Sequence, residues 1–243
     1  MIVLDVIRSF FLWVIFLAIL IWIVLWISLN KLVNPSYTPH HFFIKISKFI
    51  VWISGVKLNI HGLEHIDPDQ SYIVTFNHFN FFDHFFLYGA LGIKLTGLEK
   101  EHHLKLPIYG QFMKHAGIIP IPPRGNTEKA MQALDAAKSK MIEEGFSILI
   151  APEGTRCRDG KLGRFKKGAF YMAIQTGQPI LPVAYDKNMY HFHGRGRFII
   201  RPCEINLHIL RPLATQDLSD KDVPQLVTDL RSLYIKEVGE TYL

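Results

Sequence analysis

The sequence predicts an α/β fold, in which a mainly parallel sheet is flanked by helices and preceded by an N-terminal two-helix membrane anchor. Beyond residue 56, short runs rich in Val, Ile and Phe alternate with longer helical patterns, as expected when helices connect parallel strands. Before that point the chain is strongly apolar, and hydrophobic residues make up 49% of the whole, a high share for a soluble domain. We therefore expect an anchor over residues 1–56 and one folded domain over residues 57–243.

The first anchor helix is expected over residues 10–29, "FFLWVIFLAILIWIVLWISL", which contain no charged side chain. A helix of about 20 residues spans about 30 Å, enough to cross the hydrocarbon core of a bilayer. A cleavable signal peptide is the alternative, but its apolar region would be about 7 to 15 residues long and would end in small residues. The sequence favours a retained anchor. It leaves open whether this helix spans the bilayer or lies buried in one leaflet.

A second, amphipathic helix is expected over about residues 39–54. It places Phe42, Ile46 and Ile50 on one face and lysines around the opposite side, a pattern typical of a helix in the membrane interface. More basic residues follow the first helix than precede it, which predicts that the folded domain faces the cytoplasm. We expect the bacterial inner membrane as the location, with the endoplasmic reticulum as the second choice.

The folded domain is expected to contain short strands joined by helices. The strands are expected at "KLNIHGL", "YIVTFNH", "LTGLEK", "GIIPIP", "FSILIAPEG" and "ILPVAYD", and as a late pair within "RFIIRPCEINLHIL". The helices are expected over residues 81–91, 106–115, 127–144, 168–176 and 224–238. Gly177 and Gly239 follow the last two helices, where glycine commonly supplies the left-handed helix stop.

Composition narrows the function classes. The chain has two cysteines, Cys157 and Cys203, too few for a disulfide framework and without zinc-site spacing, so we expect no metal. The formal net charge is +6, and residues 156–167 alone contain six basic residues against one acidic residue. A basic patch of this kind is suited to phosphate groups. We expect its partner to be membrane lipid and not nucleic acid.

The stretch "NHFNFFD" holds a candidate catalytic pair, His78 and Asp83. On a continuous helix, residues five apart would point about 140° away from each other, so the chain must turn between them. If a strand ends near Phe76, Asn80 can cap the next helix and Asp83 then reaches back toward the preceding loop. Asp83 would fix the imidazole tautomer and make His78 a general base. The alternative is a strand-end histidine beside a capping aspartate.

The stretch "APEGTR", residues 151–156, holds a second candidate site. It follows the apolar run "FSILI", which places Glu153 and Arg156 at the carboxyl end of a strand, the edge where α/β sheets bind ligands. Further on, Lys167 and Gly168 open a helix whose N-terminus attracts anions. Together these residues predict a phosphate-binding site, with an isolated surface turn as the alternative.

At these two motifs the chain resembles the 1-acylglycerol-3-phosphate acyltransferases and related glycerolipid acyltransferases, over roughly residues 57–213. The resemblance implies that His78 and Asp83 of the HX4D block are catalytic. The stretch "EKEHHLKLPIYGQFMKHAGIIPIPPRG" is similar to the family's stretch from a lysine before the pocket to an arginine. With the EGTR block, which would bind the acceptor's phosphate, it implies substrate-binding roles for Lys100, Arg124, Glu153, Gly154, Thr155 and Arg156. We include Lys167 in the same phosphate site because it opens the helix whose N-terminus attracts anions.

The resemblance also implies a reaction. An acyl group would pass from an acyl thioester to the free sn-2 hydroxyl of 1-acylglycerol-3-phosphate (lysophosphatidate), giving phosphatidate in phospholipid biosynthesis. His78 would deprotonate the hydroxyl, and no acyl-enzyme would form. No cofactor is expected, because acyl-CoA or acyl carrier protein is a co-substrate. In the second case acyl carrier protein is also a partner.

Four alternatives stay open at this point. Another glycerolipid acyltransferase would use glycerol-3-phosphate or a lysophospholipid as acceptor. Cys157 would be a covalent nucleophile if the neighbouring Arg156 lowers the pKa of its thiol. Twelve histidines, including His102 and His103, suggest a metallohydrolase, although no HExxH-like ligand set occurs in the sequence. A monotopic protein that binds anionic lipid without turnover would need no catalytic pair.

Overall fold

The protein is built on a seven-stranded sheet in the order β1-β7-β6-β2-β5-β3-β4. The computed structural model describes residues 2–122, 125–157, 159–193 and 198–241. The strands are β1 (Lys57–His61), β2 (Ile73–Phe76), β3 (Leu95–Lys100), β4 (Ile119–Ile121), β5 (Ser147–Ile150), β6 (Ile180–Tyr185) and β7 (Glu204–Ile209). Over these described strands, β6 and β7 are the one antiparallel pair. The predicted α/β class with a mainly parallel sheet is confirmed.

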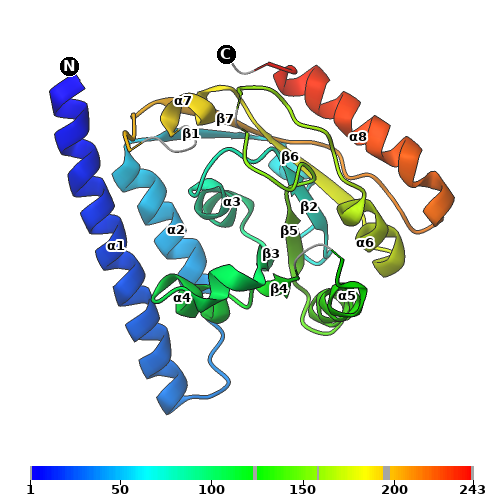
Figure 1. Cartoon of the computed structure of the whole chain (residues 1–243), viewed down its shortest axis with the longest axis horizontal. Coiled ribbons are helices and arrows are strands. Elements are labelled where there is room, and N and C mark those ends of the chain that lie inside the picture. Colours follow the sequence, from blue (N-terminus) through cyan, green and yellow to red (C-terminus); the bar gives the residue numbers. More distant parts are fainter. Residues whose placement is uncertain (1, 123–124, 158, 194–197, 242–243) are drawn as a thin grey trace.

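Helices cover both faces of the sheet. α2 (His40–Ser54) and α3 (Asp83–Leu91) lie on one side, and α6 (Gly168–Thr176) and α8 (Val223–Val238) lie on the other (Figure 1). The remaining α-helices are α1 (Ile2–Val33), α4 (Tyr109–His115), α5 (Thr127–Ile142) and α7 (Asn188–Phe192), and short 3-10 helices span Leu63–His65, Glu101–Lys105 and Asp220–Asp222. The sheet is therefore the middle layer of three.

The central strands are buried because helices cover both of their faces. All residues of β2 and β6 are buried, whereas β7 alternates between buried and more exposed positions. On one face, the hydroxyl of the buried Tyr234 in α8 lies 3.2 Å from Thr75 Oγ1 of β2 and 3.1 Å from the Val183 carbonyl of β6. α8 is thereby fixed across two adjacent strands.

Most predicted elements are present, with shifts at their ends. The first helix extends over residues 2–33, beyond the predicted 10–29, and α4 begins at Tyr109, three residues after its predicted start. α3 begins at Asp83, because the two residues before it form a turn. The short helix α7 was not predicted.

The predicted late pair of strands is wrong. β7 is present, but residues 198–203 form no strand. Pro202 has no backbone N–H with which to extend a sheet. The segment instead bonds to α1, where the Ile200 N–H donates to Ser9 Oγ at 2.9 Å. A contact with a helix far away in sequence therefore replaces the expected strand pairing.

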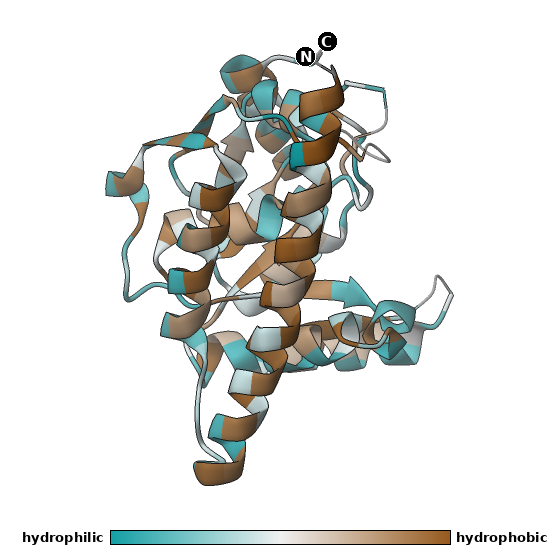
Figure 2. Ribbon diagram, turned by 90° about the vertical axis from the view of Figure 1, so that its left-hand side faces the viewer, coloured by the Kyte–Doolittle hydropathy of each residue, from teal (hydrophilic) through white to brown (hydrophobic). Residues whose placement is uncertain are grey.

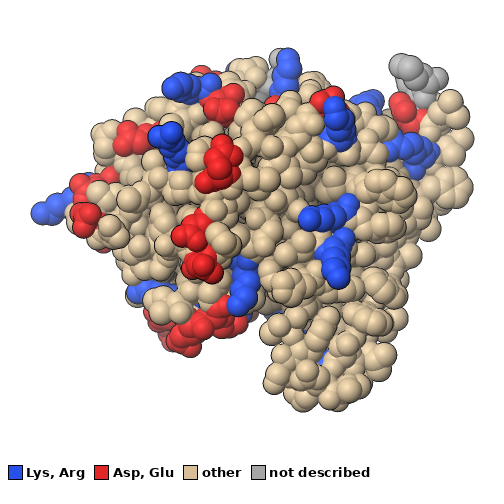
Figure 3. Space-filling view, turned by 180° about the vertical axis from the view of Figure 1, so that it is seen from behind, with Lys and Arg blue, Asp and Glu red and all other residues tan. Residues whose placement is uncertain are grey.

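α1 is long and apolar enough, by length and composition, to cross a membrane. Figure 2 shows apolar residues along its whole length. Ile23 and Ile27 are fully buried, whereas Leu25 and Leu29 are exposed by 63% and 59%. The lower end of the molecule in Figure 3, where α1 ends and turns toward α2, is almost free of charged side chains. α1 therefore both packs on the protein and presents an apolar outer face, and its role as a membrane anchor stays a prediction.

α2 contributes to the core of the protein. Phe43, Ile46 and Ile50 are buried, and the helix packs along α3. Phe49 and Trp52 are exposed, so the single apolar face expected for this helix is divided between the core and the surface. We infer that only the exposed side of α2 is free to meet a membrane.

This division gives a prediction about the two sides of α2. Ile50→Ala should lower the free energy of unfolding by about 2–5 kcal/mol, because Ile50 is 1% exposed and its loss leaves a cavity. Phe49→Ala is the matched control, since Phe49 is 42% exposed and the change should stay within about 0.5 kcal/mol. Denaturant unfolding in detergent measures both. Equal losses would contradict the packing of α2 as part of the core.

Candidate active site

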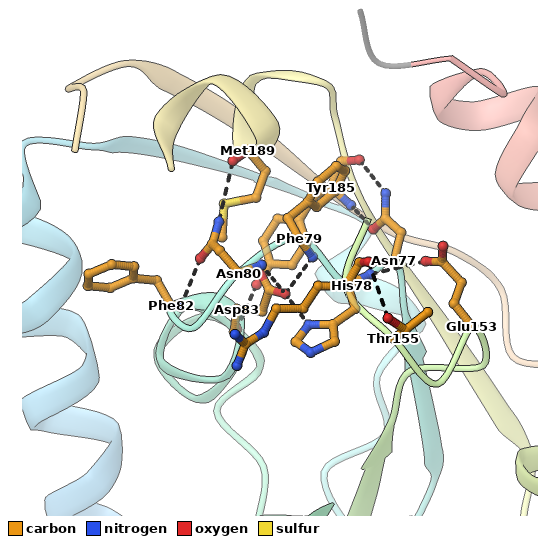
Figure 4. Close-up of polar contacts among 11 residues, drawn as sticks. Asn77, His78, Phe79, Asn80, Phe82, Asp83, Glu153, Thr155, Tyr185 and Met189 are labelled. Carbon is orange, nitrogen blue, oxygen red and sulfur yellow. Dashed lines mark hydrogen bonds and ion pairs between the residues drawn. The ribbon is translucent and has the colours of Figure 1, made fainter. Parts of the chain in front are cut away.

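Two loops meet at the carboxyl edge of the sheet. β2 and β5 are parallel neighbours, so the segments that follow them leave the sheet at the same edge. The backbone N–H of Cys157 donates to the His78 carbonyl at 2.7 Å and joins the two segments directly. Figure 4 shows His78, Asp83 and Glu153 at this junction. The fold thus brings together two motifs that are far apart in the sequence, since His78 and Glu153 are separated by 75 positions.

His78 and Asp83 form the predicted pair. His78 Nδ1 lies 2.5 Å from Asp83 Oδ2, and the Asp83 side chain is completely buried while that of His78 is 15% exposed. A carboxylate oxygen accepts hydrogen bonds only, so we assign the ring proton to Nδ1. The other ring nitrogen, Nε2, then keeps its lone pair and can take a proton from a substrate.

The loop between His78 and Asp83 turns as the spacing predicted. Asp83 Oδ2 also accepts hydrogen bonds from the backbone N–H groups of Phe79 (2.8 Å) and Asn80 (3.1 Å). Asn80 Oδ1 accepts from the N–H of Phe82 at 2.8 Å, which closes the turn at the start of α3. One carboxylate oxygen therefore holds both the imidazole and the backbone of the loop.

Strand β6 supports this loop from the side. Asn77 Oδ1 accepts from the Tyr185 N–H and Asn77 Nδ2 donates to the Tyr185 carbonyl, both at 2.8 Å. The Tyr185 hydroxyl donates to the backbone carbonyl of Asp83 at 2.8 Å. Sequence reasoning missed Asn77 and Tyr185. The available signal was a polar residue, Asn77, directly after a mostly apolar strand.

Glu153 of the EGTR motif holds backbone groups of both loops. Oε1 accepts from the His78 N–H at 3.3 Å and Oε2 accepts from the Gly163 N–H at 2.7 Å. The residue is 4% exposed, and burial raises the pKa of its carboxyl group. A Cβ at position 163 would lie 2.7 Å from Oε2, so glycine is needed for this approach. These contacts favour a positioning role for Glu153 over a contact with phosphate.

The rest of the motif is open to solvent. Gly154 and Thr155 are exposed and Arg156 is half-buried. The Arg156 guanidinium is close enough to His84 and Tyr109 for its charge to act on both. Arg156 is thus a cation on the same side of the sheet as the His78 and Asp83 pair.

The other predicted binding residues are less directly connected. Lys167 is exposed at the start of α6, and Lys100 is exposed at the end of β3. Within residues 2–122, 125–157, 159–193 and 198–241, neither lysine side chain bonds to the catalytic pair. Arg124 lies outside the described residues. The substrate-binding roles of these three residues stay predictions.

An apolar pocket begins beside the catalytic pair. It lies between α2, α3 and α4, and its lining includes Phe81, His84, Tyr109 and Phe112. The ring centroids of His78 and His84 are 5.9 Å apart, and the ring planes are at 89° to each other. The pocket is therefore close enough to His78 to hold the apolar part of a substrate. Neither His84 nor Tyr109 was identified from the sequence.

The surroundings of Cys157 do not favour the covalent alternative. The residue is buried, its thiol lies 3.6 Å from the Lys161 carbonyl, and burial raises the pKa of the thiol. The covalent alternative required the neighbouring Arg156 to lower that pKa. A thiol with a raised pKa is a poor nucleophile, which weakens the covalent alternative. In the part of the chain that the structure describes, no three His, Cys, Asp or Glu side chains are grouped to hold a metal ion.

Sequence comparison finds the same similarity along most of the chain. The family model described as acyltransferase matches residues 57–186. The 1-acyl-sn-glycerol-3-phosphate acyltransferase of Limnanthes douglasii is 31% identical over 193 residues, which is 79% of this chain and 67% of the relative. The alpha form of that enzyme from Mus musculus is 27% identical over 180 residues, covering 74% of this chain and 63% of the relative. The chain thus spans about two thirds of the length of these relatives.

Structural comparison extends the similarity to nearly the whole chain. The crystal structure of the 1-acyl-sn-glycerophosphate acyltransferase PlsC from Thermotoga maritima superposes with a TM-score of 0.75. The match covers 97% of this chain and 95% of that one, at 22% sequence identity. The two proteins therefore share their fold, including the region of the two N-terminal helices.

The contacts of Glu153 give a prediction about stability. Glu153→Ala removes the acceptor of two backbone N–H groups, so the free energy of unfolding should fall by about 1–3 kcal/mol or more. Thr155→Ala, in the same loop but exposed, is the control and should change it by less than about 0.5 kcal/mol. Chemical unfolding followed by circular dichroism measures both. If Glu153→Ala leaves the free energy of unfolding unchanged, the carboxylate does not hold the loops.

Proposed function

The chain belongs to the acyltransferase family, and on that premise we propose that it transfers an acyl group from an acyl thioester to the sn-2 hydroxyl of 1-acylglycerol-3-phosphate, giving phosphatidate. The observation that carries the proposal is the His78 and Asp83 pair at the mouth of an apolar pocket. Relatives from a plant and a mammal bear the name of this activity.

His78 acts as the general base. With Nδ1–H bonded to Asp83, Nε2 takes the proton of the acceptor hydroxyl as its oxygen attacks the thioester carbonyl. The tetrahedral intermediate then collapses, the carbon–sulfur bond breaks, and the imidazolium returns its proton to the departing thiolate. The products are phosphatidate and a free thiol. No group on the protein is acylated in this sequence.

The two substrates approach the pair from different sides. The acyl chain of the donor occupies the apolar pocket, where burying each CH₂ group contributes about 0.8 kcal/mol. The phosphate of the acceptor binds at Arg156, whose guanidinium can donate two parallel hydrogen bonds, with the exposed Gly154, Thr155 and Lys167 nearby. Lys100 and Arg124 complete the proposed set of substrate-binding residues.

The protein works at a membrane surface in this proposal. α1 anchors the chain, the exposed side of α2 contacts lipid, and the domain faces the cytoplasm. The bacterial inner membrane is our first choice and the endoplasmic reticulum the second. No cofactor takes part. The donor is acyl-CoA or acyl carrier protein, and the latter would be a protein partner.

Direct measurement of products tests the proposal. Purified protein in detergent is mixed with lysophosphatidate and a labelled acyl-CoA, and phosphatidate and free thiol are both quantified. We expect one phosphatidate for each thiol released. Binding of lysophosphatidate without turnover would favour the non-enzymatic lipid-binding alternative. Turnover with glycerol-3-phosphate or another lysophospholipid in place of lysophosphatidate would assign a different acceptor within the same family.

The catalytic pair gives a prediction about kinetics. His78→Ala should lower kcat by about 10² to 10⁴, the usual contribution of a general base. Asp83→Asn keeps an oxygen acceptor for the loop but loses the carboxylate, and the double variant should be no slower than the slower single variant because the two groups act together. His61→Ala, an exposed histidine on β1, is the control. Losses that multiply in the double variant would contradict a coupled pair.

Arg156 gives a prediction about the acceptor. Arg156→Lys keeps the charge but not the two parallel hydrogen bonds. The kcat/KM for lysophosphatidate should therefore fall, by an amount that corresponds to a loss of about 1–3 kcal/mol of transition-state stabilisation. The loss should be much smaller for monoacylglycerol, which has no phosphate. Steady-state rates of both enzymes with both acceptors measure this difference. An equal proportional loss would mean that Arg156 supports the fold or the donor instead.

A further inference from the structure

His84 is a polar residue in the wall of the apolar pocket. It follows Asp83 in the first turn of α3, and it lines the pocket together with Phe81 and Tyr109. Its ring packs edge-on against that of His78, with 5.9 Å between ring centroids, and against that of Phe76 at 5.7 Å. His84 has no part in the proton transfer by His78, although its ring is in contact with that of His78.

The nitrogens of His84 are available to a ligand. Across the described residues, neither of them makes a hydrogen bond, whereas the hydroxyl of Tyr109 in the same wall donates to Glu99 Oε2 at 3.3 Å. A polar group in an apolar wall is stable only when it finds a partner. His84 is only partly buried, so water can bond to these nitrogens until a molecule that occupies the pocket takes its place.

His84 is neutral at physiological pH. Burial, followed by the charge of His78, lowers the pKa of His84 to about 4, and the nearby Arg156 acts in the same direction. Asp83 and Glu99 oppose this shift without reversing it. A neutral imidazole carries one N–H group, so it can donate a hydrogen bond without bringing a second positive charge next to His78.

We propose that His84 is a further catalytic residue, which donates a hydrogen bond to the carbonyl oxygen of the acyl thioester. The proposal rests on the acyl transfer proposed above. A base lies about 2.6–3.2 Å from the oxygen whose proton it takes, and an oxyanion donor lies about 2.7–3.1 Å from the charged oxygen. The two packed imidazoles, with centroids 5.9 Å apart, leave no room between them, but both are partly exposed, so a hydroxyl and a carbonyl that lie across their open side can each reach one ring.

The role of His84 follows the charge in the reaction. As the acceptor oxygen forms its bond to the carbonyl carbon, the π electron pair moves to the carbonyl oxygen, which becomes negative. The N–H of His84 stabilises this oxygen, and no proton leaves His84. When the carbonyl re-forms and the thiolate departs with its electron pair, the hydrogen bond weakens again. The hydrogen bond is strongest in the transition state, so it raises kcat.

The competing interpretation is that His84 only shapes the acyl pocket. A wall residue affects binding of the donor, which changes KM, whereas an oxyanion donor affects the transition state, which changes kcat. His84→Phe keeps an aromatic ring of similar size but has no N–H group. His84→Asn and His84→Gln keep an amide N–H at two different distances from the backbone. These variants separate the two interpretations.

The experiment uses the full-length protein in detergent with lysophosphatidate and a long-chain acyl-CoA. We expect His84→Phe to lower kcat by about 10² to 10³ with little change in the KM of acyl-CoA. Either His84→Asn or His84→Gln should have a kcat at least about tenfold higher than that of His84→Phe. His191→Phe, the same change at an exposed histidine on α7, is the control. Thermal unfolding checks that each variant is folded. If His84→Phe does not fold, His84→Ala replaces it as the variant without a hydrogen-bond donor.

Each result is decisive. A normal kcat in His84→Phe, or a raised KM for acyl-CoA with kcat unchanged, would overturn the role of His84 as an oxyanion donor. An equal loss in the Phe, Asn and Gln variants would do the same, because the donor group would then not matter. If the wild-type protein forms no acylated product at all, the proposed function itself fails. A failure of the present inference is therefore distinguishable from a failure of the reaction.

Discussion

The hydrogen bonds to Asp83 Oδ2 are the constraint on which the rest of the site depends. This one oxygen accepts from the His78 imidazole and from the backbone N–H groups of Phe79 and Asn80. The carboxylate is fully buried, so water does not compete for these bonds. Because Asp83 begins α3, its position is set by a rigid helix. The imidazole therefore has its tautomer, its orientation and its loop fixed by the same group.

The surrounding fold holds the backbone on both sides of the catalytic pair. Tyr185 of β6 holds the backbone of Asp83 from one side, and Glu153 holds the backbone of His78 from the other. α2 packs along α3 and closes the apolar pocket from outside. The same helix that covers the pocket also exposes Phe49 and Trp52. We infer that the route from a membrane to the catalytic pair is short.

The sequence predicted the parts of the structure that are local. The turn between His78 and Asp83 followed from their spacing, and the mainly parallel sheet followed from the alternation of apolar runs and helices.

Predictions were less complete where contacts between distant segments determine the structure. Ser9 of α1 bonds to the segment before β7, which was expected to be a strand, and no local pattern in that segment reveals this. Glu153 was grouped with the phosphate site because it adjoins Arg156 in sequence, yet its carboxylate points to backbone groups. His84 is next to Asp83 in the chain, but only the packing of α2 and α4 makes its surroundings a pocket.

The central claim is that Asp83 holds His78 as the Nδ1–H tautomer, with Nε2 free to act as the base. ¹⁵N NMR of the protein with labelled histidine, assigned by comparison with His78→Gln, measures this directly. At neutral pH we expect His78 to show a protonated Nδ1 and an unprotonated Nε2, and to lose this pattern in Asp83→Asn. A His78 that carries its proton on Nε2 in the wild-type protein would contradict the account.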